Sequence, residues 1–403
     1  MDSIKQNNFG FWLLILTFVG TVLFPPLSVH ASAPKIEVSD VTFVLLAAYT
    51  LVLYSNSLIN VLSRHKWIFI TFIGLVCVAS ISIVFNGRVS QYRDWFEPLK
   101  FLKLIGFFAF VLIYFKESNL RRFMKFTFIS VLIFNLLHYF NLFDFNNTIE
   151  VFYSPKHHLD FFGLNSIGEP ATRRMLGTLG NPNNNAILFL LFLVYFLPKR
   201  GAKLGEDHIY VSISAIFVLA CQSRTGFLTL VVLLLAYFIT QRINWKQIAF
   251  YIGSISVGYV LLQLSGNIYL GSLADLTLLE SAKRGRFEQW VLIIESMPGK
   301  WILGHGVNKA YLEANDIYAE SEYMLLLFRY GLLGVLSYLS ICWMFFRTSV
   351  TNIKSKGGMT ILGVLIIMLV PGLTNSPFHV VKLSVLIVFL LGIGLNLIDG
   401  KKN

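Results

Sequence analysis

The strongest constraint on this chain is a series of apolar runs about as long as a bilayer is thick. The runs at 67–85, 323–346 and 380–398 each contain one charged residue at most. A bilayer core of about 30 Å is crossed by about 20 apolar residues in a helix, and lipid offers the backbone no hydrogen-bond partner. Only 13% of the residues are charged, against about 25% in a soluble domain. The sequence predicts an all-α polytopic membrane protein.

About twelve transmembrane helices are predicted from these runs. Residues 1–403 would form one integral membrane domain, with polar loops at 144–180 and 266–320, the larger one between the ninth and tenth spans. The first run also allows a cleaved signal peptide, because Ala31, Ser32 and Ala33 resemble a cleavage site. The predicted spans are 9–29, 41–62, 67–85, 98–115, 126–143, 184–197, 209–220, 227–240, 247–265, 323–346, 361–373 and 380–398.

The basic residues predict how the spans are oriented. An even number of spans puts both termini on one side, and most Lys and Arg, such as Arg64, Lys199 and Lys354, lie in short loops on that side. Lys and Arg are retained in cytoplasmic loops, so we expect cytoplasmic termini and external long loops. The formal charge of +12 also suits a surface for an anionic lipid or a phosphate group.

Basic residues in the predicted external loops are candidates for binding phosphate. Arg224 lies in the short turn at 222–226 between two apolar runs, where a charge is costly and marks a functional candidate. The alternative is an arginine that reaches the lipid headgroups. Arg284 and Arg286 lie in the longer loop and Arg174 ends the shorter one. A guanidinium group binds phosphate through two parallel hydrogen bonds.

Other residues near these arginines are candidates for binding sugar. Asn181 and Asn183 belong to an Asn-rich stretch, whose amides would hydrogen-bond sugar hydroxyls. Asn181 would otherwise cap a helix that begins at Pro182. Trp290 follows Arg286 by one helical turn, and His305 stands between two glycines. For His305 we expect a structural role or a contact with substrate.

An acidic pair, Glu320 and Glu322, precedes the span at 323–346. Acidic residues stabilise a helix N-terminus, and one positioned carboxylate can also act as a general base toward a sugar hydroxyl. The chain has no Walker A, HExxH, Asp-x-Asp or CxxC pattern. We therefore expect no cofactor, no dedicated metal site and no nucleic-acid partner.

Several short motifs follow one another along the chain: GTLGNPNNNA (177–186), SRTG (223–226), RFEQW (286–290), GHG (304–306), ESEYM (320–324) and RYGLLG (329–334). Their order resembles that in the O-antigen ligase and Wzy-type polymerase superfamily of bacterial surface-polysaccharide enzymes. The ligases have a histidine at the position of Glu320, and this difference favours the polymerase branch, while the base stays open between Glu320 and Glu322.

The resemblance implies a metal-independent glycosyltransferase of GT-C-like architecture in the bacterial inner membrane. Arg224 and Arg286 would hold the pyrophosphate of an undecaprenyl-pyrophosphate-linked oligosaccharide, and a hydroxyl of another lipid-linked repeat would attack the sugar. The product would be O-antigen or capsule polymer, and a chain-length regulator protein is a further expected partner. The alternatives are an O-antigen ligase that uses lipid A core or another acceptor, and a lipid-linked sugar flippase.

Overall fold

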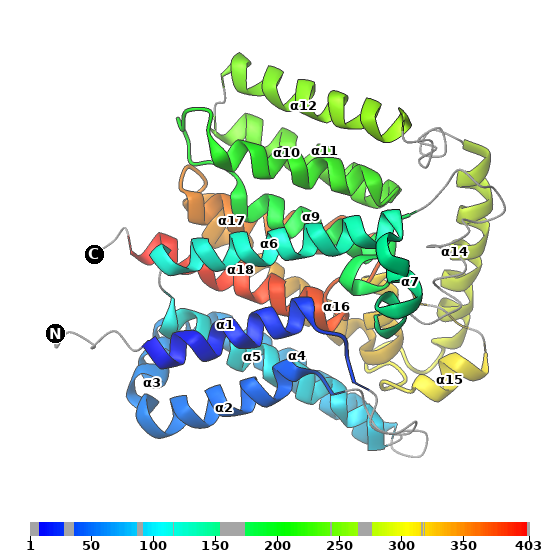
Figure 1. Cartoon of the computed structure of the whole chain (residues 1–403). Helices are drawn as coiled ribbons and strands as arrows, with labels where there is room; N and C mark the ends of the chain where they lie inside the picture. The colour runs from blue at the N-terminus through cyan, green and yellow to red at the C-terminus, as the bar shows by residue number, and fades with distance from the viewer. Residues whose placement is uncertain are drawn as a thin grey trace.

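The computed structural model describes residues 8–27, 36–86, 92–115, 117–153, 174–241, 244–264, 276–315, 317 and 319–400. Within this part of the chain the regular structure is helical, and one isolated bridge pairs Leu27 with Ile36. Most helices run side by side, while α14 lies across one end of the bundle (Figure 1). The prediction of a helical fold is confirmed.

The longer helices are α1 (Asn8–Leu23), α2 (Val38–Leu53), α3 (Ser55–Arg64), α4 (Lys66–Phe85), α5 (Phe96–Tyr114), α6 (Glu117–Phe140), α9 (Pro182–Phe196), α10 (Glu206–Ala220), α11 (Arg224–Gln241), α12 (Trp245–Leu264), α14 (Leu276–Ser296), α16 (Glu322–Thr351), α17 (Lys356–Leu369) and α18 (Val381–Asp399). The short helices are η1 (Tyr92–Trp95), η2 (Leu142–Asp144), α7 (Phe145–Thr148), η3 (Glu150–Phe152), η5 (Gly177–Leu179), α15 (Lys309–Ala314) and η6 (Pro371–Leu373).

Seven helical segments in the described part of the chain are long and apolar enough to cross a membrane. They belong to α4, α6, α11, α12, α16, α17 with η6, and α18, and α1 and α9 are shorter apolar helices. Each predicted span meets one of the helices, or a bent pair in the case of 41–62. The architecture is that of a multi-pass membrane protein.

The run at 41–62 differs from its prediction as one straight span. It breaks at Tyr54, and the axes of α2 and α3 meet at 97°. Ser and Asn recur through α3, which ends at Arg64; none of its residues is buried, and its apolar side chains gather on one side. Such a helix is stable lying along a membrane surface, whereas its polar face would be costly in hydrocarbon. The bend therefore follows from the polarity of α3.

Two other predicted boundaries differ in the structure. The basic segment predicted to connect two spans at 116–125 is helical from Glu117, as part of α6, and its Arg121 Nη2 lies 2.7 Å from Asp207 Oδ1 at the start of α10. The predicted loop at 266–320 contains the long helix α14 and the short helix α15. Polar helices at the ends of a bundle carry no apolar run, so hydropathy alone does not reveal them.

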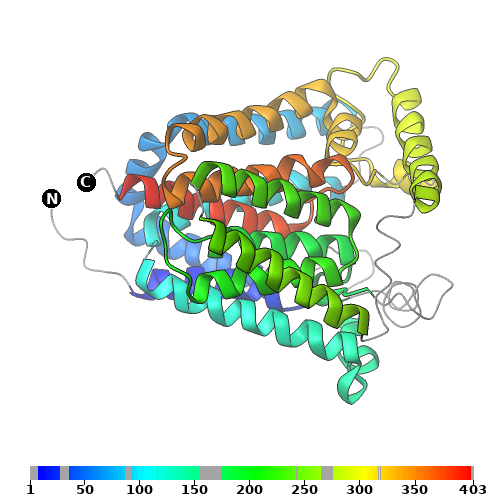
Figure 2. The ribbon, with the colours of Figure 1, turned by 90° about the horizontal axis from the view of Figure 1, so that it is seen from above.

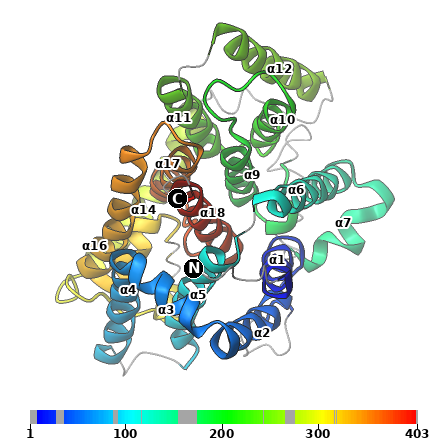
Figure 3. The same cartoon turned by 90° about the vertical axis from the view of Figure 1, so that its left-hand side faces the viewer.

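Helix α18 occupies the centre of the bundle. It packs against α5, α9, α17 and α1, and 83% of its apolar window is buried. A Cβ atom on Gly357 of α17 would lie 2.4 Å from the Gly394 carbonyl oxygen of α18. Small residues allow this close backbone approach, which is how helices pack in lipid. The remaining helices surround α18 (Figure 3).

Helix α16 is interrupted at Gly331, where φ is 65° and ψ is −162°. The turn at 301–305 fills this break, because Leu332 N–H donates to Trp301 O (2.8 Å) and His305 N–H donates to Phe328 O (2.7 Å). A Cβ atom on Gly331 would lie 2.4 Å from the carbonyl of Ile302. The GHG and RYG motifs thus form one joint between the α14–α16 connection and α16.

The two ends of the bundle are chemically different. We call the end where α1 begins and α18 finishes the terminal face, and the opposite end, crossed by α14, the α14 end (Figures 1 and 2). The first turns of α9, α11 and α16 lie at the α14 end, so this end gathers the residues singled out from the sequence.

Candidate active site

Arg174, Arg224 and Arg286 come together at the α14 end. Arg174 precedes η5 and donates from Nε to Cys221 O (3.2 Å) and from Nη2 to Gln222 O (3.2 Å). Burial lowers the pKa of the Arg174 guanidinium to about 10, and the charges of Arg224 and Arg286 act in the same direction. Three positive groups close enough to repel one another favour the binding of a multiply charged anion.

Arg224 is the first residue of α11 rather than part of a turn. Its neighbour Thr225 has Oγ1 2.6 Å from Oγ1 of Thr374 in the connection between α17 and α18. Ser223, on its other side, accepts the Gly226 N–H at 3.2 Å and so closes the first turn of α11. Residues on both sides of Arg224 are therefore fixed.

Arg286 lies on α14 and forms an ion pair with Glu320. Its Nε is 2.7 Å from Glu320 Oε2, and the two side chains are 37% and 52% exposed. An exposed pair of this kind contributes less than about 1 kcal/mol. A phosphate group could therefore take the place of Glu320 on Arg286 at little cost.

The remaining predicted ligands of the anion and the sugar have different surroundings. Asn181 caps α9, as its structural alternative predicts, because its Oδ1 accepts the N–H groups of Asn183 (2.9 Å) and Asn184 (3.2 Å). Asn183 Oδ1 accepts Arg174 Nη2 at 3.0 Å. Trp290 is half-buried on α14, one turn beyond Arg286. Arg284 lies on α14, and its side chain falls outside the described part.

His305 fixes the end of α14. Its ring stacks on Tyr311 and Phe328 with centroids 5.5 and 4.7 Å away, and its Nε2 lies 2.8 Å from Ser296 O. Burial lowers the pKa of His305. The sequence allows His305 either a structural role or a contact with substrate. These contacts support the structural role.

The two carboxylates of the acidic pair have different environments. The Glu322 side chain is 0% exposed. Its Oε2 accepts the Phe378 N–H at 3.0 Å, and its Oε1 is bonded to His379 Nδ1. Both oxygens of Glu322 thus hold the α17–α18 connection, whereas Glu320 is accessible. Of the two candidates for the base, Glu320 is exposed to solvent and Glu322 is buried.

Residues of the α17–α18 connection were not predicted from the sequence. Glu322 N–H donates to Asn375 O (3.0 Å), and Ser321 Oγ donates to Gly372 O (3.1 Å). Together with Thr374, these contacts join the segment before α16 to the start of α11. The sequence gives only a weak indication of this connection, namely the short stretch at 374–379, which contains polar residues and lies between two apolar runs.

A second group of charges lies at the same end, around Glu97 of α5. Its Oε1 is 3.6 Å from Arg329 Nη1 and 3.5 Å from Lys309 Nζ, and Lys100 Nζ donates to His379 O at 2.7 Å. Buried charges are stable when paired in this way. Arg329, a charge inside an apolar run, is thus accounted for by Glu97.

The chain was compared with known proteins: no protein-family model matches it, and no curated protein matches it. Among the residues with described side chains, no group of three or more His, Cys, Asp and Glu could hold a metal ion.

Proposed function

We propose that the protein is a membrane glycosyltransferase that polymerises the repeat units of a surface polysaccharide, an O-antigen or a capsule. The observation that carries the proposal is the group formed by Arg174, Arg224 and Arg286 with the accessible Glu320 at one end of a helical membrane bundle. Three guanidinium groups suit the pyrophosphate of a lipid-linked glycan, and a nearby carboxylate suits the activation of an acceptor hydroxyl. The order of the sequence motifs supports the same assignment.

In the proposed reaction, a hydroxyl oxygen of one undecaprenyl-linked repeat attacks the anomeric carbon of another. The bond from that carbon to the pyrophosphate oxygen breaks, and its electron pair stays on the undecaprenyl pyrophosphate. Glu320 takes the hydroxyl proton and later releases it to water. Guanidinium groups placed where negative charge develops stabilise the leaving group without reorganising.

The Arg286–Glu320 ion pair would set the order of two events in the proposed reaction, with binding of the donor substrate before release of the base. A bound pyrophosphate would compete with Glu320 for the guanidinium of Arg286, because both offer negatively charged oxygens to the same donor. The Glu320 carboxylate would then be released from its partner as the donor substrate arrives. The base would thus become available when there is a glycan to transfer.

The proposed topology has about twelve spans in a GT-C-like arrangement in the bacterial cytoplasmic membrane. Both termini would be cytoplasmic, because Arg64, Lys199, Arg200, Lys354 and Lys356 all lie at the terminal face, as retention of positive charge predicts. The α14 end, with the arginines and Glu320, would then face the outside. A chain-length regulator would be a further partner there.

The test is a surface-polysaccharide gel from a deletion strain complemented with the wild-type gene, Glu320→Gln or Glu295→Gln. We expect a ladder from the wild type and from Glu295→Gln, an exposed carboxylate of α14, and a single repeat unit from Glu320→Gln. A full ladder from Glu320→Gln at normal membrane abundance would exclude Glu320 as the base.

The deletion strain itself separates the proposed function from its alternatives. Loss of all surface glycan with long lipid-linked polymer accumulating would indicate a ligase. Single lipid-linked units trapped on the cytoplasmic side would indicate a flippase.

A further inference from the structure

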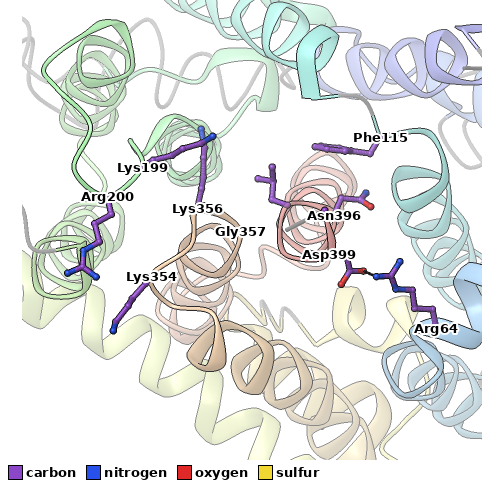
Figure 4. Close-up of a pocket in the computed structure, with 11 residues that line it drawn as sticks. Arg64, Phe115, Lys199, Arg200, Lys354, Lys356, Gly357, Asn396 and Asp399 are labelled. Atoms are coloured by element: carbon purple, nitrogen blue, oxygen red, sulfur yellow. Dashed lines mark ion pairs between the residues drawn. The ribbon is translucent and has the colours of Figure 1, made fainter. Parts of the chain in front are cut away.

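The terminal face contains a cavity of about 700 Å³ whose lining is strongly basic (Figure 4). The segments that form it are far apart in the sequence: the ends of α3 and α5, the α9–α10 connection, the turn between α16 and α17 with the start of α17, and the end of α18. Five basic side chains and one acidic side chain line it, namely Arg64, Lys199, Arg200, Lys354, Lys356 and Asp399.

The single carboxylate of the lining is already engaged. Asp399 Oδ2 lies 3.2 Å from Arg64 Nη2 and 3.3 Å from His65 Nε2. Arg200 and Lys354 lie on the opposite side of the view from this pair, with their charged ends pointing away from it (Figure 4), and both are exposed. The lining therefore has an excess of positive charge on the side away from Asp399.

The start of α17 adds backbone donors to the same wall. Ser355 caps this helix by accepting the Gly358 N–H at 2.9 Å, and Lys356 and Gly357 of the first turn line the cavity. The first N–H groups of a helix have no partner within the helix, and the helix dipole makes this end positive. Phosphate groups bind at such helix starts, here beside several cationic side chains.

Retention of positive charge explains why basic residues occur on this side, but it does not explain a shared cavity. Charge retention requires only that Lys and Arg lie in loops near the membrane. Here residues from five separate segments surround one hollow at the end of the central helix, and the apolar side chains of Phe115 and Leu397 are part of its lining. This arrangement provides several donors, excess positive charge and limited apolar contact.

We propose that this cavity binds a phosphate-bearing ligand on the terminal face. The phosphate group could belong to the headgroup of an anionic phospholipid or to a soluble phosphate compound, because both present the same oxygens to the same donors. The site is separate from the arginine group at the α14 end, and it does not depend on the proposed transferase activity.

The test counts probe molecules bound to the purified full-length protein in neutral detergent by native mass spectrometry. The probes are short-chain phosphatidylglycerol and inorganic pyrophosphate, with zwitterionic phosphatidylcholine for comparison. We expect the double variant Arg200→Gln/Lys354→Gln to bind one equivalent of an anionic probe at least tenfold more weakly than the wild-type protein does. Lys246→Gln/Arg347→Gln removes the same charge from exposed positions outside the cavity and should not weaken it.

The outcomes distinguish the sources of the phosphate and the two sites. Loss of phosphatidylglycerol binding in Arg200→Gln/Lys354→Gln would identify a lipid, and loss of pyrophosphate binding alone in that variant would identify a soluble ligand. Arg200→Lys/Lys354→Arg should restore binding if charge is what matters. The Arg286→Ala protein reports separately on the α14 end. Equal weakening in both double variants, or binding of neither anionic probe, would overturn the proposal.

Discussion

The two ends of this bundle both gather positive charge, yet they hold it differently. At the α14 end, Arg174 is fixed by two backbone carbonyls and Asn183, and Arg286 by Glu320. At the terminal face, mainly lysines surround an open cavity. An arginine fork held in one orientation suits a reaction in which charge develops at a defined place, whereas lysines act as mobile point charges. The two ends therefore differ in how their positive side chains are paired and buried, rather than in how many positive side chains they have.

The sharpest test of this comparison removes one arginine at a time from the α14 end. We expect Arg224→Ala or Arg286→Ala to lower the polymerisation rate by about 10²–10³, the usual loss when one positioned donor is removed. The measurement is polymer formation at equal membrane abundance. Arg347→Ala, an exposed cation near the terminal face, should leave the rate unchanged.

Arg284→Ala belongs to the same experiment. Residues two apart on a helix have Cα atoms about 200° apart around its axis, so Arg284 should contribute less than Arg286. Equal losses from these two variants would contradict the assignment of Arg286 as the contact with phosphate.

The joint between the α14–α16 connection and α16 predicts a large loss of stability. Gly331→Ala should cost about 3 kcal/mol, because this backbone conformation is almost confined to glycine and the added methyl group meets the carbonyl of Ile302. Thermal unfolding in detergent measures the change. Gly74→Ala is the matched control, since nothing lies within 4 Å of the added atom. Similar unfolding temperatures for the two variants would show that the joint does not hold α16.

The acidic pair allows stability and activity to be separated. Glu322→Gln should lower stability by about 2 kcal/mol, because the amide has no negative charge, and hydrogen bonds to a charged carboxylate are stronger than hydrogen bonds to a neutral group. Glu320→Gln should unfold like the wild type while losing polymer. The opposite result, with Glu322→Gln stable and Glu320→Gln unstable, would reverse the roles of the two residues.

The smallest expected effect is a pH dependence from His305. Because burial lowers the pKa of His305, the unfolded chain takes up a proton more readily as pH falls below about 6.5. Stability should therefore decrease between pH 7.5 and 5.5, with about 1 kcal/mol or less from this group. In His305→Gln the same pH change should have a smaller effect on the unfolding temperature. If the unfolding temperature of His305→Gln changes with pH as much as that of the wild type, His305 does not titrate in this range.

The helices could be predicted from the sequence because an apolar run long enough for a bilayer has few alternatives to a helix. One error occurred where a helix begins with charged residues. Helix α6 starts at Glu117 because its basic first turns pair with α10. Hydropathy does not register such pairing, and it also misses the bend at Tyr54, which depends on the surface position of α3.

The chemistry of the site could be predicted only by residue type. Arg224 stood out as a charge in a costly place and Arg286 only as an arginine of the long loop, and the structure brings both near Arg174. Glu320 and Glu322, two residues apart, could not be told apart. Their difference comes from the bonds of Glu322 to Phe378 and His379, more than fifty positions later in the chain. Contacts between distant segments leave no local pattern.

The joint at Gly331 and the bonds around Glu322 have a shared consequence for how the sequence of this protein could diversify. The segment from 307 to 319 is held at one end by the docked turn and at the other by the α17–α18 connection. A loop with both ends anchored can change in length at little entropic cost. If the proposed transferase function holds, acceptor preference could therefore drift through insertions and substitutions in this segment while Arg286 and Glu320 keep their places.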